Sequence, residues 1–201
     1  MIDNVKTNKA EPKASAWRAR HFVFLAVVAL FGNGLFIYDN FSQKTAEIAA
    51  LKSQNEYVFF GRCVSSIDKK NKLPAGMAKE ICGSILKHAM AFNEDPFKVL
   101  AVMGVESNYR PSAISSAGAV GLMQIIPSAW AEKCGVEHYE LWSLDNNIRC
   151  GVLALDDYKK YGKYQLISYN RGPGNVAADL MAGVEPENGY TNRVIRVYGE
   201  I

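Results

Sequence analysis

Glu106 is the residue whose surroundings are most typical of acid/base chemistry. It directly follows Val99–Val105, a run of apolar residues and one glycine that predicts a buried helix. Burial disfavours the charged form of a carboxyl group, so we expect the pKa of Glu106 to be raised toward neutrality. A carboxyl group that is partly protonated at the working pH can donate a proton and later take one back. The alternative is a glutamate at a helix end that simply reaches water.

Glu106 has no acidic partner nearby in the sequence. It is the only acidic residue between Asp95 and Glu132. Glycoside hydrolysis ordinarily uses two carboxylates, one as the acid and one as the base or nucleophile. If this protein cleaves sugars, either the substrate supplies the second group or the fold brings in a distant carboxylate. The distant candidates are Asp145, Asp156, Glu185 and Glu187.

Three motifs occur in order along the second half of the chain. They read E-S-N-Y-R-P at 106–111, A-I-S and G-A-V-G-L-M-Q-I at 113–115 and 118–125, and S-Y-N-R-G-P-G at 168–174. Together they resemble the signature of the soluble lytic transglycosylase (SLT) family, and the resemblance covers roughly residues 74–198. Ordered motifs at the correct spacing are far more specific than one short match. The resemblance implies a mostly α, lysozyme-like fold and cleavage of the MurNAc–GlcNAc bond of peptidoglycan.

The resemblance also implies roles for individual residues. Glu106 matches the catalytic glutamate, and the Tyr169 hydroxyl is expected to face it. Met123 is expected in the cleft wall, and Gly118 and Gly121 are expected to let the backbone approach the glycan. Core packing is the alternative for Tyr169 and Met123. For the glycines the alternative is turn formation, and both roles can be true together. The full set of substrate-binding residues that we expect is Ser115, Gly121, Met123, Gln124, Tyr169, Asn170 and Tyr190.

The sequence departs from the family pattern near its C-terminus. The family usually has a Glu-Thr pair four residues before a tyrosine. Here the acid is Glu187, one residue out of step, and Asn188 replaces the threonine. Ser168 stands where the family usually has alanine. The role of Glu187 is therefore open.

The predicted function is that of a peptidoglycan lytic transglycosylase, which needs one carboxylate and leaves a 1,6-anhydro-MurNAc end. The first alternative is a lysozyme-type hydrolase, which would need a second acid to activate water. The second is a non-catalytic peptidoglycan-binding component of a secretion, conjugation or phage-entry machine. An active enzyme could also serve such a machine by opening the wall locally.

The excess positive charge lies at the N-terminus, before an apolar segment. Of the 23 basic and 20 acidic residues, five basic and two acidic ones precede Phe22, so the remainder is neutral and lacks the field typical of nucleic-acid binding. Residues 22–38 are nearly all apolar, at the short end of what spans a bilayer. The preceding cations predict a cytoplasmic N-terminus. A cleavable signal peptide is the alternative, and either reading exports the rest.

We therefore expect four parts in the chain. They are a cytoplasmic tail at 1–20, a single-pass signal-anchor in the cytoplasmic membrane at 21–38, a linker or juxtamembrane helix at 39–61, and the enzyme domain at 62–201, in the periplasm or outside the membrane. The linker carries apolar residues at helical spacing, which favours a spacer. A weak self-pairing segment is the alternative, although two heptads are too few to predict a coiled coil.

The four cysteines agree with an exported domain. We expect disulfides Cys63–Cys82 and Cys134–Cys150, because each closes a short loop. The three histidines are scattered and no CxxC pair occurs, so neither a metal site nor a cofactor is expected. The predicted helices are 74–92, 97–108 with Asp95 as N-cap, one from Pro127, one through Tyr158 capped by Asp145 or Asn146, and short ones at 164–169, 175–182 and 189–198.

Overall fold

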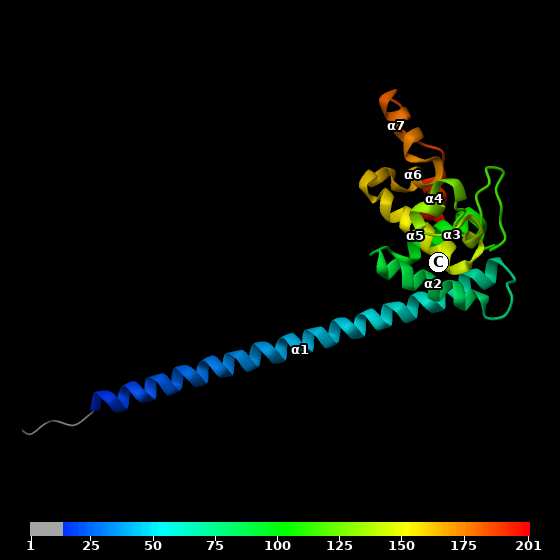
Figure 1. Cartoon of the computed structure of the whole chain (residues 1–201). Helices are drawn as coiled ribbons and strands as arrows, with labels where there is room; N and C mark the ends of the chain where they lie inside the picture. The colour runs from blue at the N-terminus through cyan, green and yellow to red at the C-terminus, as the bar shows by residue number, and fades with distance from the viewer. Residues whose placement is uncertain (1–13) are drawn as a thin grey trace, which may run out of the picture. The chain divides into compact units, whose positions relative to one another are not determined.

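The computed structural model describes the backbone of residues 14–201 and the side chains of residues 39–201. Over this range the structure is helical, and the only β-type pairings are two isolated bridges, Ile114 with Val120 and Val120 with Ile125. This confirms the predicted mostly α class. The elements are α1 (Ala14–Lys70), α2 (Met77–Ala91), α3 (Pro96–Ser107), α4 (Pro127–Cys134), η1 (His138–Trp142), α5 (Leu144–Tyr158), η2 (Lys159–Tyr164), α6 (Gln165–Arg171), α7 (Pro173–Met181) and α8 (Tyr190–Glu200) (Figure 1).

The chain divides into two units at Ser53–Gln54. The second unit begins earlier than the expected domain start at Arg62, because Phe59 on α1 is already buried in its core. Before the boundary, the helical linker leaves its apolar side chains exposed, with Phe41, Ile48 and Leu51 between 52% and 72% accessible. Among the described residues, no helix has the length and apolar character needed to cross a bilayer. The expected tail 1–20 and anchor 21–38 lie outside the residues whose side chains are described.

Helix α3 lies in the core of the second unit. Its residues 99–103 are completely buried, as the apolar run predicts. The N-cap prediction is confirmed, because the Asp95 carboxylate accepts a hydrogen bond from the Phe97 amide at 2.9 Å and Pro96 occupies the first turn. Helix α8 packs against α3, and the Tyr198 hydroxyl donates to Asp95 at 2.8 Å. The bond to Asp95 holds the N-terminal end of α3 to α8, and packing between the two helices places Glu106, at the C-terminal end of α3, beside α8 as well.

The predicted cap of α5 is wrong. The helix begins after Ser143, and Asp145 lies in its first turn. The Asp145 carboxylate instead accepts hydrogen bonds from Ser84 at 2.7 Å and contacts His88 Nε2 at 2.9 Å, both on α2. Together with Lys87, these partners lower the pKa of Asp145 to about 2, against the opposing effect of its partial burial. The side chain thus joins two helices rather than capping one.

Both expected disulfides are present. Cys63–Cys82 joins α1 to α2, and Cys134–Cys150 joins α4 to α5. Their sequence separations of 19 and 16 residues correspond to about 3 kcal/mol each from the lost freedom of the unfolded chain. The second bond anchors α4, which borders the cleft described below.

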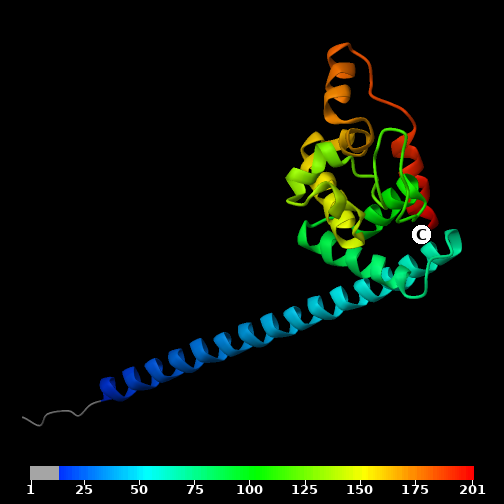
Figure 2. The same cartoon turned by 45° about the vertical axis from the view of Figure 1, so that its right-hand side comes forward.

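Helix α7 extends away from the rest of the second unit, and the chain returns from its far end to α8 (Figures 1 and 2). The excursion begins after α6 and ends at Gly189, which has the positive φ of 72° and precedes the first residue of α8. Asn170, in the last turn of α6, and Asn188, just before α8, are hydrogen-bonded at 2.7 Å although they are 18 residues apart.

Candidate active site

A cleft of about 250 Å³ opens beside the C-terminal end of α3. It is bordered by the loop 113–126, by α4 and α5, and by the end of α6. Its surface combines apolar side chains with a small number of polar ones, as is usual for a ligand site. The lining residues are Glu106, Ser115, Ala117, Ala119, Gln124, Ile125, Ile126, Trp130, Ala154, Tyr169 and Asn170.

Glu106 is partly buried at the cleft, at the second-last residue of α3. Burial raises the pKa of its carboxyl group above the ordinary value of 4.5, and this outweighs two opposing effects. One is the Tyr190 hydroxyl, which donates a hydrogen bond to Glu106 Oε1 at 2.6 Å; the other is the positive charge of Arg193. As a result, Glu106 keeps its proton to a higher pH than a glutamate in water does. The Tyr190 hydroxyl is in place to stabilise the anion once the proton has left.

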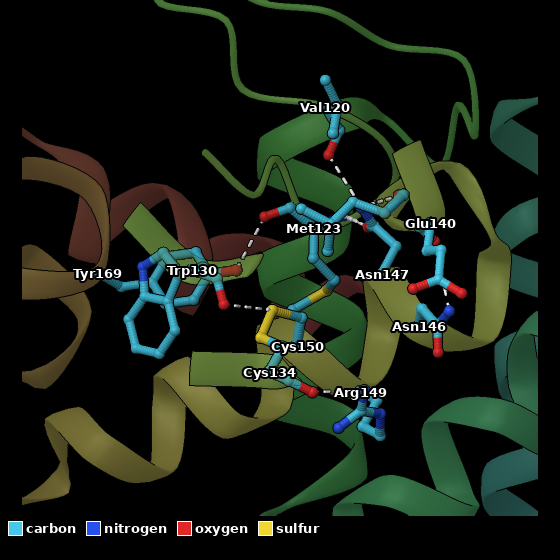
Figure 3. Close-up of a disulfide and its surroundings, with 11 residues drawn as sticks. Val120, Met123, Trp130, Cys134, Glu140, Asn146, Asn147, Arg149, Cys150 and Tyr169 are labelled. Atoms are coloured by element: carbon cyan, nitrogen blue, oxygen red, sulfur yellow. Dashed lines mark hydrogen bonds between the residues drawn. A yellow bond between two sulfur atoms is a disulfide. The ribbon is translucent and has the colours of Figure 1, made fainter. Parts of the chain in front are cut away.

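Both tyrosines lie near Glu106, but only Tyr190 is hydrogen-bonded to it. Tyr169 lines the cleft, but its hydroxyl donates to the Met123 carbonyl at 2.8 Å rather than to Glu106 (Figure 3). Tyr190, only 1% exposed, contacts the glutamate instead. Burial and the nearby Glu106 raise the pKa of both phenols well above 10, so both remain hydrogen-bond donors.

The expected role of Met123 is corrected, and Gly121 has a clear packing role. A Cβ on Gly121 would lie 2.4 Å from Asn147 Nδ2, and Gly121 has a φ of 76°, so the glycine allows both the close packing and the turn. The Met123 side chain is completely buried against Gly151 and does not line the cleft. Gly118 has a φ of 78° with open space around it, which matches a turn.

Asn147 holds this loop from beneath. Its side chain donates to the carbonyls of Val120 at 2.9 Å and Leu141 at 3.0 Å, and accepts from the Met123 amide at 2.8 Å (Figure 3). Asn147 is only 1% exposed, so its amide oxygen and nitrogen cannot bond to water, and these three hydrogen bonds satisfy both of them. The backbone that Tyr169 contacts is thereby fixed in place.

Ser115 and Gln124 border the cleft, as expected. The Ser115 hydroxyl oxygen accepts from the Ala119 amide at 3.0 Å, which leaves its own proton available. Gln124, at a φ of 50°, donates to the carbonyls of Ala113 and Gly121. Its amide nitrogen is thus bound to the loop, and its side-chain oxygen is the group left for a ligand.

The distant carboxylates that the sequence offered as second acids have other partners and do not line the cleft. Asp145 contacts α2, Asp156 pairs with Lys159 at 2.9 Å, and Glu185 pairs with Lys163 at 3.0 Å. Glu187 accepts from the Gly189 amide at 2.6 Å, so it shapes the turn before α8. Among the described residues that line the cleft, Glu106 is the only carboxylate.

Two residues of this region were not singled out from the sequence. Trp130 on α4 lines the cleft, 9% exposed, with its ring edge-to-face against Tyr158 and Lys133 over it. Trp130 lies outside the three motifs. The only signal in the sequence was a large aromatic residue in the short helix predicted from Pro127. Asn188 was noted only as a departure, yet it bonds both Asn170 and Tyr190. Over the described residues, no cluster of His, Cys, Asp or Glu could hold a metal ion.

These features define a helical, lysozyme-like domain with a single carboxylate in its cleft. The chain belongs to the Transglycosylase SLT domain family, whose model matches residues 83–184, just over half of the sequence. This confirms the family that the motifs indicated.

Two curated relatives carry the name membrane-bound lytic murein transglycosylase C. The protein of Actinobacillus pleuropneumoniae serotype 5b (strain L20) is 30% identical over 118 residues, covering 49% of this chain and 32% of that protein. The protein of Yersinia pestis (strain Pestoides F) is 22% identical over 206 residues, covering 98% of this chain and 50% of that protein. The chain thus spans half or less of the length of these relatives.

A solved structure supports the fold. The 70-kDa soluble lytic transglycosylase in complex with bulgecin A matches with a TM-score of 0.51 and 23% identity, covering 58% of this chain and 23% of that one. The likeness concerns the arrangement of helices alone, and it agrees with the lysozyme-like fold expected from the motifs.

Proposed function

We propose that this protein is a peptidoglycan lytic transglycosylase that cleaves the β-1,4 bond between MurNAc and GlcNAc and leaves a 1,6-anhydro-MurNAc end. The observation that carries the proposal is Glu106, the lone carboxylate among the described residues of the cleft: burial raises its pKa, and the Tyr190 hydroxyl donates to its oxygen. Membership of the SLT family and the names of the relatives support the substrate class.

In the first step, Glu106 acts as the general acid. Its raised pKa favours the protonated form of the carboxyl group, which gives its proton to the glycosidic oxygen as the bond to C1 of MurNAc breaks. The electron pair of that bond leaves with the GlcNAc oxygen. The carbonyl oxygen of the substrate's own N-acetyl group stabilises the positive charge at C1, as in substrate-assisted glycosidases.

In the second step, the Glu106 carboxylate acts as the base. It takes the proton from the C6 hydroxyl of the same MurNAc, and that oxygen attacks C1 to close the anhydro ring. The proton count balances, because Glu106 ends the cycle protonated as it began. Between the steps, the 2.6 Å bond from Tyr190 stabilises the carboxylate when it carries a full charge.

A hydrolase would need a different arrangement. Activating a water or forming a glycosyl-enzyme takes a second carboxyl group about 5–9.5 Å from the first. The candidates Asp145, Asp156, Glu185 and Glu187 each have other partners, and none lines the cleft with Glu106. The site therefore favours the intramolecular C6 hydroxyl over an activated water.

We also propose that residues 21–38 anchor the protein in the cytoplasmic membrane, with the N-terminus inside and the enzyme domain outside. The basic residues before the apolar segment support this orientation. The two disulfides fit an oxidising compartment. Cell fractionation combined with protease treatment of spheroplasts tests the topology: an anchored domain stays with the membrane and is digested from outside, whereas a cleaved one is released.

The reaction is tested on purified peptidoglycan with the full-length protein in detergent. Mass spectrometry of the released fragments should show muropeptides lighter by one water than the reducing forms, and none with Glu106→Gln. Reducing-end fragments would instead establish a hydrolase. The absence of fragments with the unaltered protein would favour a peptidoglycan-binding role.

A further inference from the structure

Asn188 connects the cleft residue Asn170 with the first residue of α8, Tyr190. Its side-chain Nδ2 donates to Asn170 Oδ1 at 2.7 Å, and its Oδ1 accepts from the backbone amide of Tyr190 at 3.0 Å. Asn170 lines the cleft, and the Tyr190 hydroxyl contacts Glu106. The same bond closes the base of the excursion that contains α7, which leaves the body after α6 and returns before α8 (Figures 1 and 2).

The chemistry of these groups sets the direction of the whole chain of bonds. A backbone N–H can only donate, so the Asn188 atom that faces Tyr190 must be the oxygen. The other end of the Asn188 amide is then the NH2 group, which can only donate. Asn170 must therefore present its oxygen to Asn188 and keep its own NH2 group free. No described residue accepts a hydrogen bond from Asn170 Nδ2.

We propose that Asn188 is a positioning residue that fixes the polarity of the Asn170 amide, so that the cleft offers an N–H donor at this place. The inference rests on the proposed function and adds a specificity element to it. The matching group on a glycan is one that only accepts, and the carbonyl oxygen of an N-acetyl group meets this requirement. In glucosamine, the carbon that bears the N-acetyl group carries a free amine instead. This amine is protonated and only donates, so it is repelled by the Asn170 NH2 group.

Two substitutions separate this role from the support of α8. Asn188→Asp has nearly the same shape and keeps an acceptor for the Tyr190 amide, but it cannot donate to Asn170. The Asn170 amide then turns, gives its NH2 group to the new carboxylate and shows its oxygen to the cleft. Asn188→Thr, the residue usual in the family, also keeps the acceptor and lacks the reach to Asn170. Asn188 is exposed, so we expect both variants to fold.

Asn192→Asp is the matched control for the added charge. Asn192 is exposed on α8, four residues after Asn188, and does not line the cleft, so it undergoes the same chemical change without the bond to Asn170. An effect of Asn188→Asp that Asn192→Asp also shows would come from charge alone.

The measurement is binding of a pentamer of N-acetylglucosamine, and of the matching glucosamine pentamer, to full-length protein carrying Glu106→Gln so that turnover does not interfere. Loss of one neutral hydrogen bond predicts a Kd for the acetylated pentamer that is about three- to tenfold higher with Asn188→Asp. Preference over the glucosamine pentamer should shrink by at least this factor, because the Asn170 oxygen that the variant exposes accepts a hydrogen bond from the protonated amine. In an Asn170→Ala background, Asn188→Asp should have no further effect, since its influence passes through Asn170.

The proposal is overturned if the Kd values of both pentamers are the same with Asn188→Asp as with Asn188. It is also overturned if Asn188→Asp still changes the Kd in the Asn170→Ala background. Failure of the proposed function is a separate result. It would be seen as the absence of anhydro fragments from the unaltered protein, while the pentamer measurement still decides the role of Asn188.

Discussion

Removing one hydroxyl group, with Tyr190→Phe, tests the acid/base role of Glu106. The hydroxyl donates to Glu106 Oε1 at 2.6 Å, and it lowers the pKa of a carboxyl group that burial raises. Without it, the carboxylate that forms in the first step is less stable, and the pKa of Glu106 rises further. Hydrogen bonds to charged groups contribute roughly 1.5–3 kcal/mol, which corresponds to a kcat about 10- to 100-fold lower.

The pH dependence of activity shows in which direction the pKa of Glu106 has moved. Glu106 must be protonated to act as the acid, so activity falls on the alkaline side as it ionises. Because Tyr190→Phe raises its pKa, the alkaline limb of kcat/KM should move to higher pH while the maximum falls. The assay is release of soluble muropeptides at a series of pH values, with folding checked by circular dichroism.

Tyr198→Phe is the matched control. Tyr198 lies on the same helix, and its hydroxyl donates to Asp95 at 2.8 Å, at the other end of α3. We expect unaltered kinetics from this variant. A Tyr190→Phe protein with normal kcat, or with its alkaline limb displaced to lower pH, would refute the role given to the Tyr190–Glu106 bond.

Three further predictions concern stability. The raised pKa of Glu106 means that the folded state holds its proton more tightly than the unfolded state, so stability falls as pH rises above 4.5; Glu106→Gln should raise Tm at neutral pH, and the gain should vanish below pH 4.5. Ser168→Ala should raise the free energy of unfolding by about 1 kcal/mol in urea titrations, because the Ser168 hydroxyl is fully buried without a partner among the described residues. A loss of stability would show that the hydroxyl is bonded in solution. Gly121→Ala should cost about 1–3 kcal/mol more than Gly118→Ala, since both have positive φ but only the first meets Asn147. Equal losses would mean that backbone strain alone matters.

The sequence was most informative where the signal is local. The cap at Asp95, the buried run of α3 and the two disulfides depend on residues close together in the chain, and the structure confirms all of them. Glu106 could be singled out because a carboxylate after an apolar run is costly to bury. The cap of α5 was predicted wrongly because Asp145 has stronger partners on α2, and a partner on another helix leaves no trace in the local pattern.

The hydrogen-bond partners of the residues in and around the cleft could not be read from the sequence, because they are set by distances in the folded structure. Tyr169 and Tyr190 are both tyrosines of the C-terminal part, and only packing shows that the first contacts Met123 and the second Glu106, 84 residues away. Met123 and Gly121 belong to the same motif as Gln124, yet the turn of the loop sends the first two into the core and the third to the cleft.

By itself, the sequence determined the helical class, the family, the catalytic candidate and the covalent cross-links, because periodicity, motif spacing and short loops are properties of neighbouring residues. Only the tertiary structure decided that Glu106 is the one carboxylate among the described residues that line its cleft, that Tyr190 is its donor and that Asn188 joins Tyr190 to Asn170. The reason is physical: hydrogen bonds and pKa shifts depend on separations of a few ångströms, which folding creates between residues far apart in the chain.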